Sequence, residues 1–190
     1  MNMFTAKLSP SATDMIRADH TRVLGAFHRY SIAARPQAKQ GLAESICLAL
    51  EVHAQIEEEI FYPAMRAAGS ELEKELVTEH EEMRRLISML RGIDPADVEY
   101  DRVFMELMRD VIHHVADEET VLLTHAESVL GERLGELGAR MLRRRLELKA
   151  PRAAEIARHA ARAASPVALL VSAGALVGGA LLLRSWQRRA

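Results

Sequence analysis

The chain has 190 residues, of which 49% are hydrophobic and 27% charged, so its composition supports a folded domain with a sizeable core. Aromatic residues make up only 4%, which argues against a sheet-rich fold, and the single cysteine, Cys47, excludes both an intramolecular disulfide and a cysteine-based zinc site. The net charge of −2 hides an asymmetry, because residues 1–131 are acidic and residues 132–164 are basic.

Alanine, leucine, glutamate and arginine dominate the chain and favour helix nearly throughout. Ser11 and Asp14 have the spacing of a capping box, and Asp94 followed by Pro95 has the pattern of a second helix start. We predict helices at residues 11–35, 38–67, 70–91, 94–130 and 132–164, the last with an interruption near Pro151. Because the connections are short, the predicted fold is all-α: an up-down-up-down four-helix bundle followed by a C-terminal basic helix.

A long uncharged segment follows the basic helix. Residues 163–183 carry no charged side chain, and these 21 residues reach about 31 Å, the thickness of one hydrocarbon core. Arginines flank the segment and Trp186 lies at its border, as membrane-surface anchors do. The pattern predicts a single transmembrane helix at residues 163–186, with a buried helix of a soluble domain as the alternative. Gly174 and Gly178 form a GxxxG pattern through which two such helices could pair as a homo-oligomer.

The apolar stripes of the predicted bundle helices contain polar residues. In the second helix, His53 and Glu57 continue a stripe of leucine and isoleucine at steps of three and four. His20 lies in the stripe of the first helix and His80 in the stripe of the third. These positions predict imidazole and carboxylate groups inside the core.

The fourth helix offers two His-x3-acid pairs. His113 with Asp117 would share a face with other acidic residues, whereas His114 with Glu118 continues the apolar stripe. The helical phase therefore selects His114 and Glu118 as the core pair.

The polar core residues form a repeat. His20 and His53 are 33 residues apart, His80 and His114 are 34 apart, and each second histidine precedes a glutamate by four residues. Two packed hairpins would bring four imidazoles and two carboxylates together, where burial without partners costs on the order of several kcal/mol per group. Imidazole and carboxylate suit iron, zinc, copper or manganese. Since one zinc ion needs only four ligands, six ligands predict two ions.

With these residues in place, the sequence resembles the hemerythrin family, specifically the bacterial HHE cation-binding domains. The matching segments are "ADH" ending at His20, "HAQIEEEIFYP" at residues 53–63, "EHEEM" around His80 and "HHVADEETVLL" at residues 113–123. The resemblance implies two non-haem iron ions, a di-iron centre with oxo or carboxylate bridges that binds O2 or related small oxidants. The metal ligands that it implies are His20, His53, Glu57, His80, His114 and Glu118.

One position departs from the family pattern. The oxygen-carrying members place two histidines on the third helix, whereas the residue one turn after His80 here is Arg84. A seventh ligand would then come from Glu58 or from water.

The resemblance implies a protein that binds or senses O2, NO or iron. The alternative is a di-iron redox enzyme acting on peroxide or NO, and a third interpretation is a bundle with structural zinc. No flavin motif or catalytic nucleophile is evident, so whether the protein is an enzyme stays open. The predicted partners are a small ligand (O2, NO or peroxide) and the membrane, and no nucleic acid.

The predicted location follows from the uncharged segment. Because the start of the chain lacks the apolar core of a signal peptide, we expect a single-pass, tail-anchored membrane protein whose N-terminal domain is cytoplasmic. The predicted domains are a metal-binding bundle at residues 11–131, a basic juxtamembrane helix at residues 132–162 and the anchor at residues 163–186. The basic helix suits anionic lipid better than nucleic acid.

Overall fold

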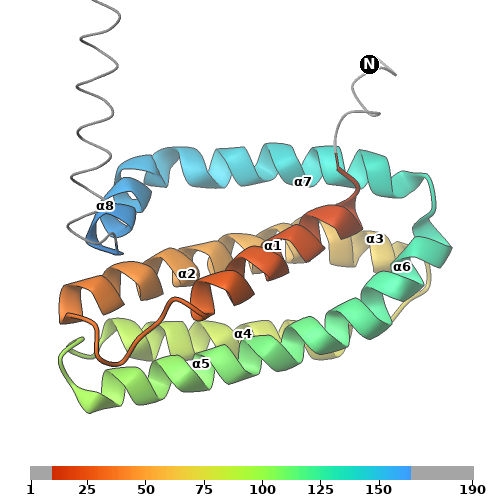
Figure 1. Cartoon of the computed structure of the whole chain (residues 1–190). Coiled ribbons are helices and arrows are strands. Elements are labelled where there is room, and N and C mark those ends of the chain that lie inside the picture. Colours follow the sequence, from red (N-terminus) through yellow and green to blue (C-terminus); the bar gives the residue numbers. More distant parts are fainter. Residues whose placement is uncertain (1–9, 164–190) are drawn as a thin grey trace, which may run out of the picture.

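A computed structural model describes residues 10–163, and all regular structure in that range is helical, which confirms the all-α prediction (Figure 1). The chain forms α1 (Ala12–Phe27), α2 (Pro36–Ile56), the π-helical turn η1 (Glu57–Phe61), α3 (Tyr62–Ala67), α4 (Glu73–Arg91), α5 (Val98–Asp117), the π-helical turn η2 (Glu118–Leu122), α6 (Leu123–Leu130), α7 (Arg133–Lys149), the 3-10 turn η3 (Ala150–Arg152) and α8 (Ala153–Ala163).

The first six α-helices form a bundle with four arms, and α7 and α8 cover one side of it. The arms are α1, then α2 continued through η1 into α3, then α4, then α5 continued through η2 into α6. Helix α7 lies along α1 and α2, on the side away from α4 and α5, and α8 packs on α2 (Figure 1). One pair of arms is therefore covered by additional helices and the other pair is not.

The hydrophobic core consists of two clusters. One contains Phe27, Leu86 and Phe104, and the other contains Ile16 and Phe61. In each arm, the residues of the two clusters are separated by the polar positions that interrupt the apolar stripe. The fold thus places a polar layer between two apolar layers.

Several helix ends confirm the sequence signals. Ser11 caps α1 and forms a complete capping box with Asp14, as predicted. Gly69 (φ 85°) and Gly131 (φ 48°) adopt left-handed backbone conformations just beyond helix ends, which glycine tolerates best. The predicted interruption near Pro151 is the 3-10 turn between α7 and α8.

Two predicted helix ends were wrong. The first helix ends at Phe27 instead of residue 35, because Tyr30 turns inward, stacks on Phe104 and donates a hydrogen bond to Asp101 at 2.6 Å. The fourth bundle helix begins at Val98 instead of residue 94. Its cap is Asp97, whose side chain accepts a hydrogen bond from the backbone N–H of Glu99 at 2.9 Å.

Helix α7 approaches the start of α1 closely. A Cβ atom on Gly138 would lie 2.2 Å from the carbonyl oxygen of Pro10, so any side chain there would push the two segments apart. Gly135, one turn earlier in α7, faces open space, with no atom within 4 Å of such a Cβ. Gly138 therefore permits a close contact that fixes α7 on the bundle.

The prediction of a transmembrane helix was wrong. None of the helices within residues 10–163 is both long and apolar enough to cross a membrane. The last of them, α8, has 11 residues and two arginines, and reaches only about 16 Å, half of a hydrocarbon core. Of the predicted anchor at residues 163–186, Ala163 ends α8, and the remainder, with Gly174 and Gly178, lies outside the described residues. The expectation of a tail-anchored membrane protein with a cytoplasmic N-terminal domain is withdrawn with it.

Candidate metal centre

The six residues predicted as metal ligands lie together in the polar layer of the core. Each is at most 3% exposed to solvent, and between them they come from all four arms of the bundle. Their ligand atoms form two overlapping groups, within each of which all atoms lie within 4.8 Å of one another. The first group is His20, His53, His114 and Glu118, and the second is His53, Glu57, His80 and His114.

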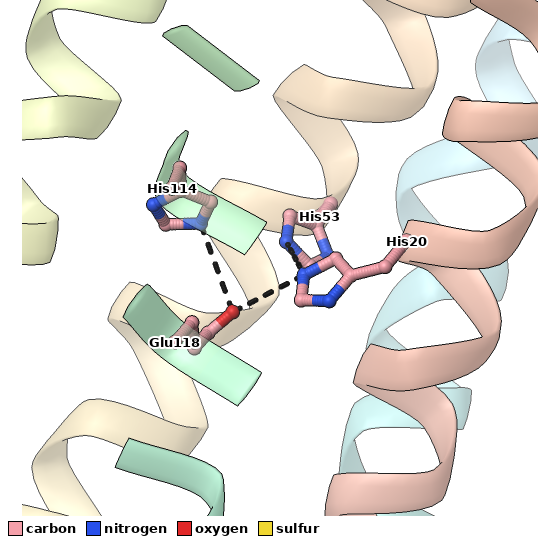
Figure 2. A group of neighbouring side chains, drawn as sticks. All are labelled: His20, His53, His114 and Glu118. Carbon is pink, nitrogen blue, oxygen red and sulfur yellow. Dashed lines mark hydrogen bonds and ion pairs between the residues drawn. The ribbon is translucent and has the colours of Figure 1, made fainter. Parts of the chain in front are cut away.

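The two buried carboxylates each reach imidazoles from both hairpins. Glu57 Oε1 lies 3.2 Å from Nε2 of His53, while its Oε2 lies 3.5 Å from Nε2 of His80. Glu118 Oε2 lies 3.2 Å from Nε2 of His20 and 3.7 Å from Nε2 of His114 (Figure 2). Both carboxylates are therefore placed to bridge two cation positions.

The four imidazoles form two pairs with their Nε2 atoms facing one another. In the first hairpin, Nε2 of His20 lies 3.3 Å from Nε2 of His53 (Figure 2). In the second hairpin, the same distance separates the Nε2 atoms of His80 and His114. Each pair could serve as one half of a site for two ions.

Carboxylates outside the layer bind three of the four outer imidazole nitrogens. The Nδ1 atoms pair as follows: His20 with Glu119 at 2.8 Å, His80 with Glu58 at 3.0 Å and His114 with Glu79 at 2.8 Å. Because a carboxylate only accepts hydrogen bonds, each Nδ1 carries the proton and each Nε2 presents its lone pair inward. Metal-binding histidines are usually held by such a partner on the other nitrogen.

The π-helical turns bring a tyrosine under the layer. In η1 the backbone N–H of Tyr62 bonds to the carbonyl of Glu57, five residues earlier, so these two side chains share a face that an α-helix would separate. The Tyr62 hydroxyl, fully buried, lies 3.4 Å from Glu57 Oε2 and 3.4 Å from Glu118 Oε1. Burial, with the nearby carboxylates, raises the pKa of Tyr62 well above its ordinary value, so the phenol keeps its proton.

The two carboxylates differ in proton affinity. Burial, followed by the charge of Glu118, raises the pKa of Glu57 well above its ordinary value. Burial also acts to raise the pKa of Glu118, but the close approach of His20 and the charges of His114 and His53 outweigh burial and lower the pKa of Glu118 to about 2. Of the two buried carboxylates, Glu57 therefore has the higher proton affinity.

The donor atoms fit metal ions. Glu57 Oε1 and Glu118 Oε2 are buried and accept no hydrogen bond from the described residues. In the second hairpin, where a carboxylate binds Nδ1 of both His80 and His114, the two Nε2 lone pairs face each other at 3.3 Å and repel each other unless a cation lies between them. Four imidazole nitrogens and two carboxylates suit iron, zinc, copper or manganese, and the number of donors suits two ions.

Three further residues that the sequence analysis discussed as possible ligands or ligand positions lie outside the two ligand groups. His113 is exposed and lies outside both ligand groups. Glu58, considered as a seventh ligand, instead accepts hydrogen bonds from His80 and from Arg84, whose Nη2 lies 2.8 Å from both carboxylate oxygens. Arg84 therefore replaces a ligand position with a residue that anchors an outer carboxylate.

Sequence reasoning missed three of the outer carboxylates, Asp19, Glu79 and Glu119, and considered the fourth, Glu58, only as a metal ligand. Each of the four directly precedes or follows a core ligand in the sequence. The signal that could have found them is this adjacency, in the pairs "DH", "EE", "EH" and "EE".

Comparisons with known proteins agree with this geometry. The sequence profile described as "Hemerythrin HHE cation binding domain" matches residues 11–126. A DNA nickase of Nostoc sp. is 34% identical over 110 residues, a match that covers 57% of this chain and 31% of the nickase, so the chain spans about a third of that relative's length. The crystal structure of a hemerythrin HHE cation-binding domain-containing protein from Mycobacterium kansasii has a TM-score of 0.67 at 18% identity, covering 80% of this chain and 99% of that one, and supports the fold alone.

Proposed function

The chain belongs to the hemerythrin HHE cation-binding domain family, and on that premise we propose that its core binds two non-haem iron ions and acts as a binding or sensing module for O2, NO or iron. The ligands in this proposal are the four inward imidazoles and the two bridging carboxylates. Iron bound there would supply a redox-active centre with an open position for a small ligand.

The observation that carries the proposal is the orientation of the imidazoles. Nε2 of all four rings faces the buried carboxylates, while a carboxylate outside the layer lies toward each Nδ1. A core that only needed to satisfy its polar groups would not leave two carboxylate oxygens without hydrogen bonds. Metal binding offsets both the burial and the lone-pair repulsion.

The residues around the layer restrict what can enter. The six ligands are nearly inaccessible to water, so only a small molecule could reach the inner atoms. A cleft of about 280 Å³ between α4 and η2 is lined by Glu79, Asp117 and Leu122 together with other residues. Because Glu79 also binds the buried His114, the floor of this cleft adjoins the layer. It is the side from which we expect O2, NO or a cation to approach.

A second function is favoured by one observation, the position of Tyr62. Its hydroxyl keeps its proton and lies between the two carboxylates, 3.4 Å from each. A buried hydroxyl at that point can serve as the proton donor in reductive chemistry on peroxide or NO. The alternative proposal is therefore a redox enzyme in which Tyr62 donates a proton to the bound substrate.

Turnover separates the two proposals. The full-length protein, loaded with iron and kept reduced by an excess of a chemical reductant, is mixed with NO or with hydrogen peroxide while its optical spectrum and the concentration of the added molecule are recorded, with a protein-free sample as the control for the reductant. A spectral change that stops at a fixed molar ratio supports binding or sensing, and continued consumption supports the enzyme. A protein that purifies with zinc, stays colourless and does not take up iron would contradict both.

The activity of the nickase relative is not transferred to this chain. The match covers 31% of that protein, and the buried layer described here contains no group exposed to a macromolecular substrate. We retain the expectation that the small ligand, and not a nucleic acid, is the partner of the core.

A further inference from the structure

Helix α7 reaches the outer layer of the metal centre through one arginine. Arg145 is 9% exposed, and its Nη2 donates a hydrogen bond to Oδ2 of Asp19, the residue before His20. The other oxygen, Oδ1, is held by Nη1 of Arg22 at 2.7 Å. Both oxygens of Asp19 are therefore bound to guanidinium groups.

The binding of Asp19 by two arginines leaves Nδ1 of His53 without a hydrogen bond to that carboxylate. Its Nδ1 lies 3.7 Å from the same Oδ2 that Arg145 binds, which is too long for a hydrogen bond, and it is buried without another hydrogen-bond partner among the described residues. The other three imidazoles have Nδ1 between 2.8 and 3.0 Å from their carboxylates. His53 is thus the one ligand imidazole in the described layer whose outer nitrogen is not supported.

The competition for Asp19 has a physical cause. A hydrogen bond between a guanidinium and a carboxylate carries charge on both sides and is about twice as strong as one with a neutral donor, such as an uncharged imidazole N–H. The Nη2 of Arg145 lies within hydrogen-bond distance of Oδ2, whereas Nδ1 of His53 does not, so the guanidinium holds the shared oxygen. Asp19 therefore stays with Arg145 as long as α7 is docked.

Helix α7 lies outside the region that the family profile matches, which ends at residue 126. It is docked by the close approach of Gly138 to α1, whereas the ion pair between Arg144 and Glu59 at 2.6 Å lies at the surface, where such pairs contribute little to docking. An element beyond the metal-binding domain thus contacts a residue that supports a ligand.

We infer that α7 regulates the His53 half of the metal centre, because docked Arg145 holds Asp19 away from His53. This inference rests on the proposed function, since it needs a metal ion bound by His20 and His53. When α7 moves away, Asp19 is free to accept the Nδ1 proton of His53. A histidine whose outer nitrogen is supported in this way binds a metal ion about 10- to 100-fold more tightly. Docking of α7 therefore weakens one of two otherwise similar metal positions.

The test is a metal titration of the full-length protein, with Co2+ as an oxygen-stable probe. Arg145→Met is compared with Arg144→Met, a matched control on the same helix whose partner, Glu59, is exposed and contacts no ligand. We expect wild type to bind Co2+ in one tight and one weaker step, and Arg145→Met to tighten the weaker step about tenfold. Arg144→Met should leave both steps unchanged.

Two further variants secure the test. Arg145→Lys keeps the positive charge and should tighten the weaker step by less than Arg145→Met does. In an Asp19→Asn background, Arg145→Met should have no effect on either step, because the carboxylate for which the two groups compete is gone. An equal response of Arg145→Met with and without Asp19 would overturn the inference, as would a titration in which Arg145→Met and Arg144→Met behave alike.

A readout without metal separates this inference from the proposed function. In metal-free protein with ¹⁵N-labelled histidine, the Nδ1 proton of His53 should become hydrogen-bonded in Arg145→Met and shift downfield, with no such shift in Arg144→Met. The number of Co2+ ions bound by wild type tests the proposed function by itself. A proton signal of His53 that is the same in wild type and Arg145→Met would rule out the regulatory contact even if two ions bind.

Discussion

The hairpin of α1 and α2 and the hairpin of α4 and α5 contribute equivalent ligands to the metal centre, 60 or 61 residues apart in the chain: His20 and His80, His53 and His114, Glu57 and Glu118. The inner distances follow the same repeat, since the two Nε2 atoms of each hairpin are 3.3 Å apart. The π-helical turns also recur at the same place in both hairpins. The ligand layer is therefore close to two-fold symmetric.

The surroundings of the two halves differ. Glu79 lies 2.8 Å from His114, whereas its counterpart Asp19 lies 3.7 Å from His53 and is bound by Arg145. The hydroxyl under the layer also comes from the first hairpin alone, because the residue equivalent to Tyr62 is Leu123.

This difference separates two requirements. The proposed metal binding depends on the inner residues, which recur in both hairpins. The strength and reactivity of each half depend on the outer residues, and these can vary while the bundle stays intact. We therefore expect substitutions of inner residues to affect both halves alike and substitutions of outer residues to affect one half.

Removal of an inner histidine should have the largest effect, and it should be equal in the two halves. His53→Ala and His114→Ala should each lose metal and lower the thermal stability of the loaded protein, because a bound ion stabilises only the folded state. His113→Ala is the matched control, since His113 is exposed and borders His114. Metal analysis and thermal melting measure both quantities. Full metal content in either inner variant, or metal loss in His113→Ala alone, would refute the ligand assignment.

Substitution of an outer carboxylate should distinguish the halves. Glu79→Gln removes the charge that holds His114 and should weaken one metal-binding step by about tenfold, the lower end of the range for such partners. Asp19→Asn should weaken binding less, because Asp19 is already too far from His53 for a hydrogen bond. Co2+ titration of the two variants measures the difference. Equal losses would mean that the two halves are supported alike.

The packing of α7 on the first hairpin can be weakened without substituting a charged residue. Gly138→Ala places a Cβ atom against the backbone of Pro10 and should lower the free energy of unfolding by about 1–3 kcal/mol. Gly135→Ala, in the same helix but facing open space, should raise it by about 0.5–1 kcal/mol through helix propensity. Urea unfolding of the metal-free protein measures both. If the two alanine variants have the same stability, α7 does not pack as described.

The smallest predicted effect is a pH dependence that has opposite signs for two histidines of one half. Burial lowers the pKa of His53 from its ordinary 6.5 to about 4, so the unfolded chain takes up a proton in that range and the folded chain does not. His53 therefore costs stability as pH falls from 6.5 toward 4.

His20 behaves in the reverse way. Burial acts to lower its pKa, but bonds with Glu118 and Glu119 outweigh burial and raise the pKa of His20. Its contribution to stability is full below the ordinary pKa of 6.5 and is lost as pH rises through the raised value. In metal-free protein, His53→Leu should gain stability relative to wild type as pH falls from 7 to 5, and His20→Leu should lose it. Urea midpoints at the two pH values decide the signs, and a common sign for the two variants would be incompatible with these environments.

Sequence periodicity was sufficient to predict the residues of the inner layer, but it did not predict the contacts of the outer carboxylates. The positions of His53 and Glu57 follow from steps of three and four along one helix, which is local information. The contact of Arg145 with Asp19 joins residues 126 positions apart, and no local pattern distinguishes Arg145 from the neighbouring arginines of α7. The position of Tyr62 under the layer does not follow from α-helical periodicity either, since the π-helical turn shifts the helical phase by one residue.

The helix ends and the predicted anchor also show that local sequence patterns do not predict features that depend on distant contacts. Ser11 starts α1 with a capping box that can be read from four residues. The end of that helix at Phe27 depends on a contact between Tyr30 and Asp101 in a different arm. No local sequence pattern predicts this contact. The uncharged segment after Ala163 predicted a membrane helix from composition alone, and no helix within residues 10–163 can cross a membrane.

The central claim is that one buried layer of four histidines and two glutamates binds two metal ions. Native mass spectrometry of the full-length protein, loaded with Fe2+ without oxygen and freed of excess metal, tests it most directly. The account predicts a mass corresponding to two iron ions per chain in wild type, and a species with fewer than two in both His53→Ala and His114→Ala. A wild-type protein that retains one ion or none, or two ions that persist in both variants, would contradict it.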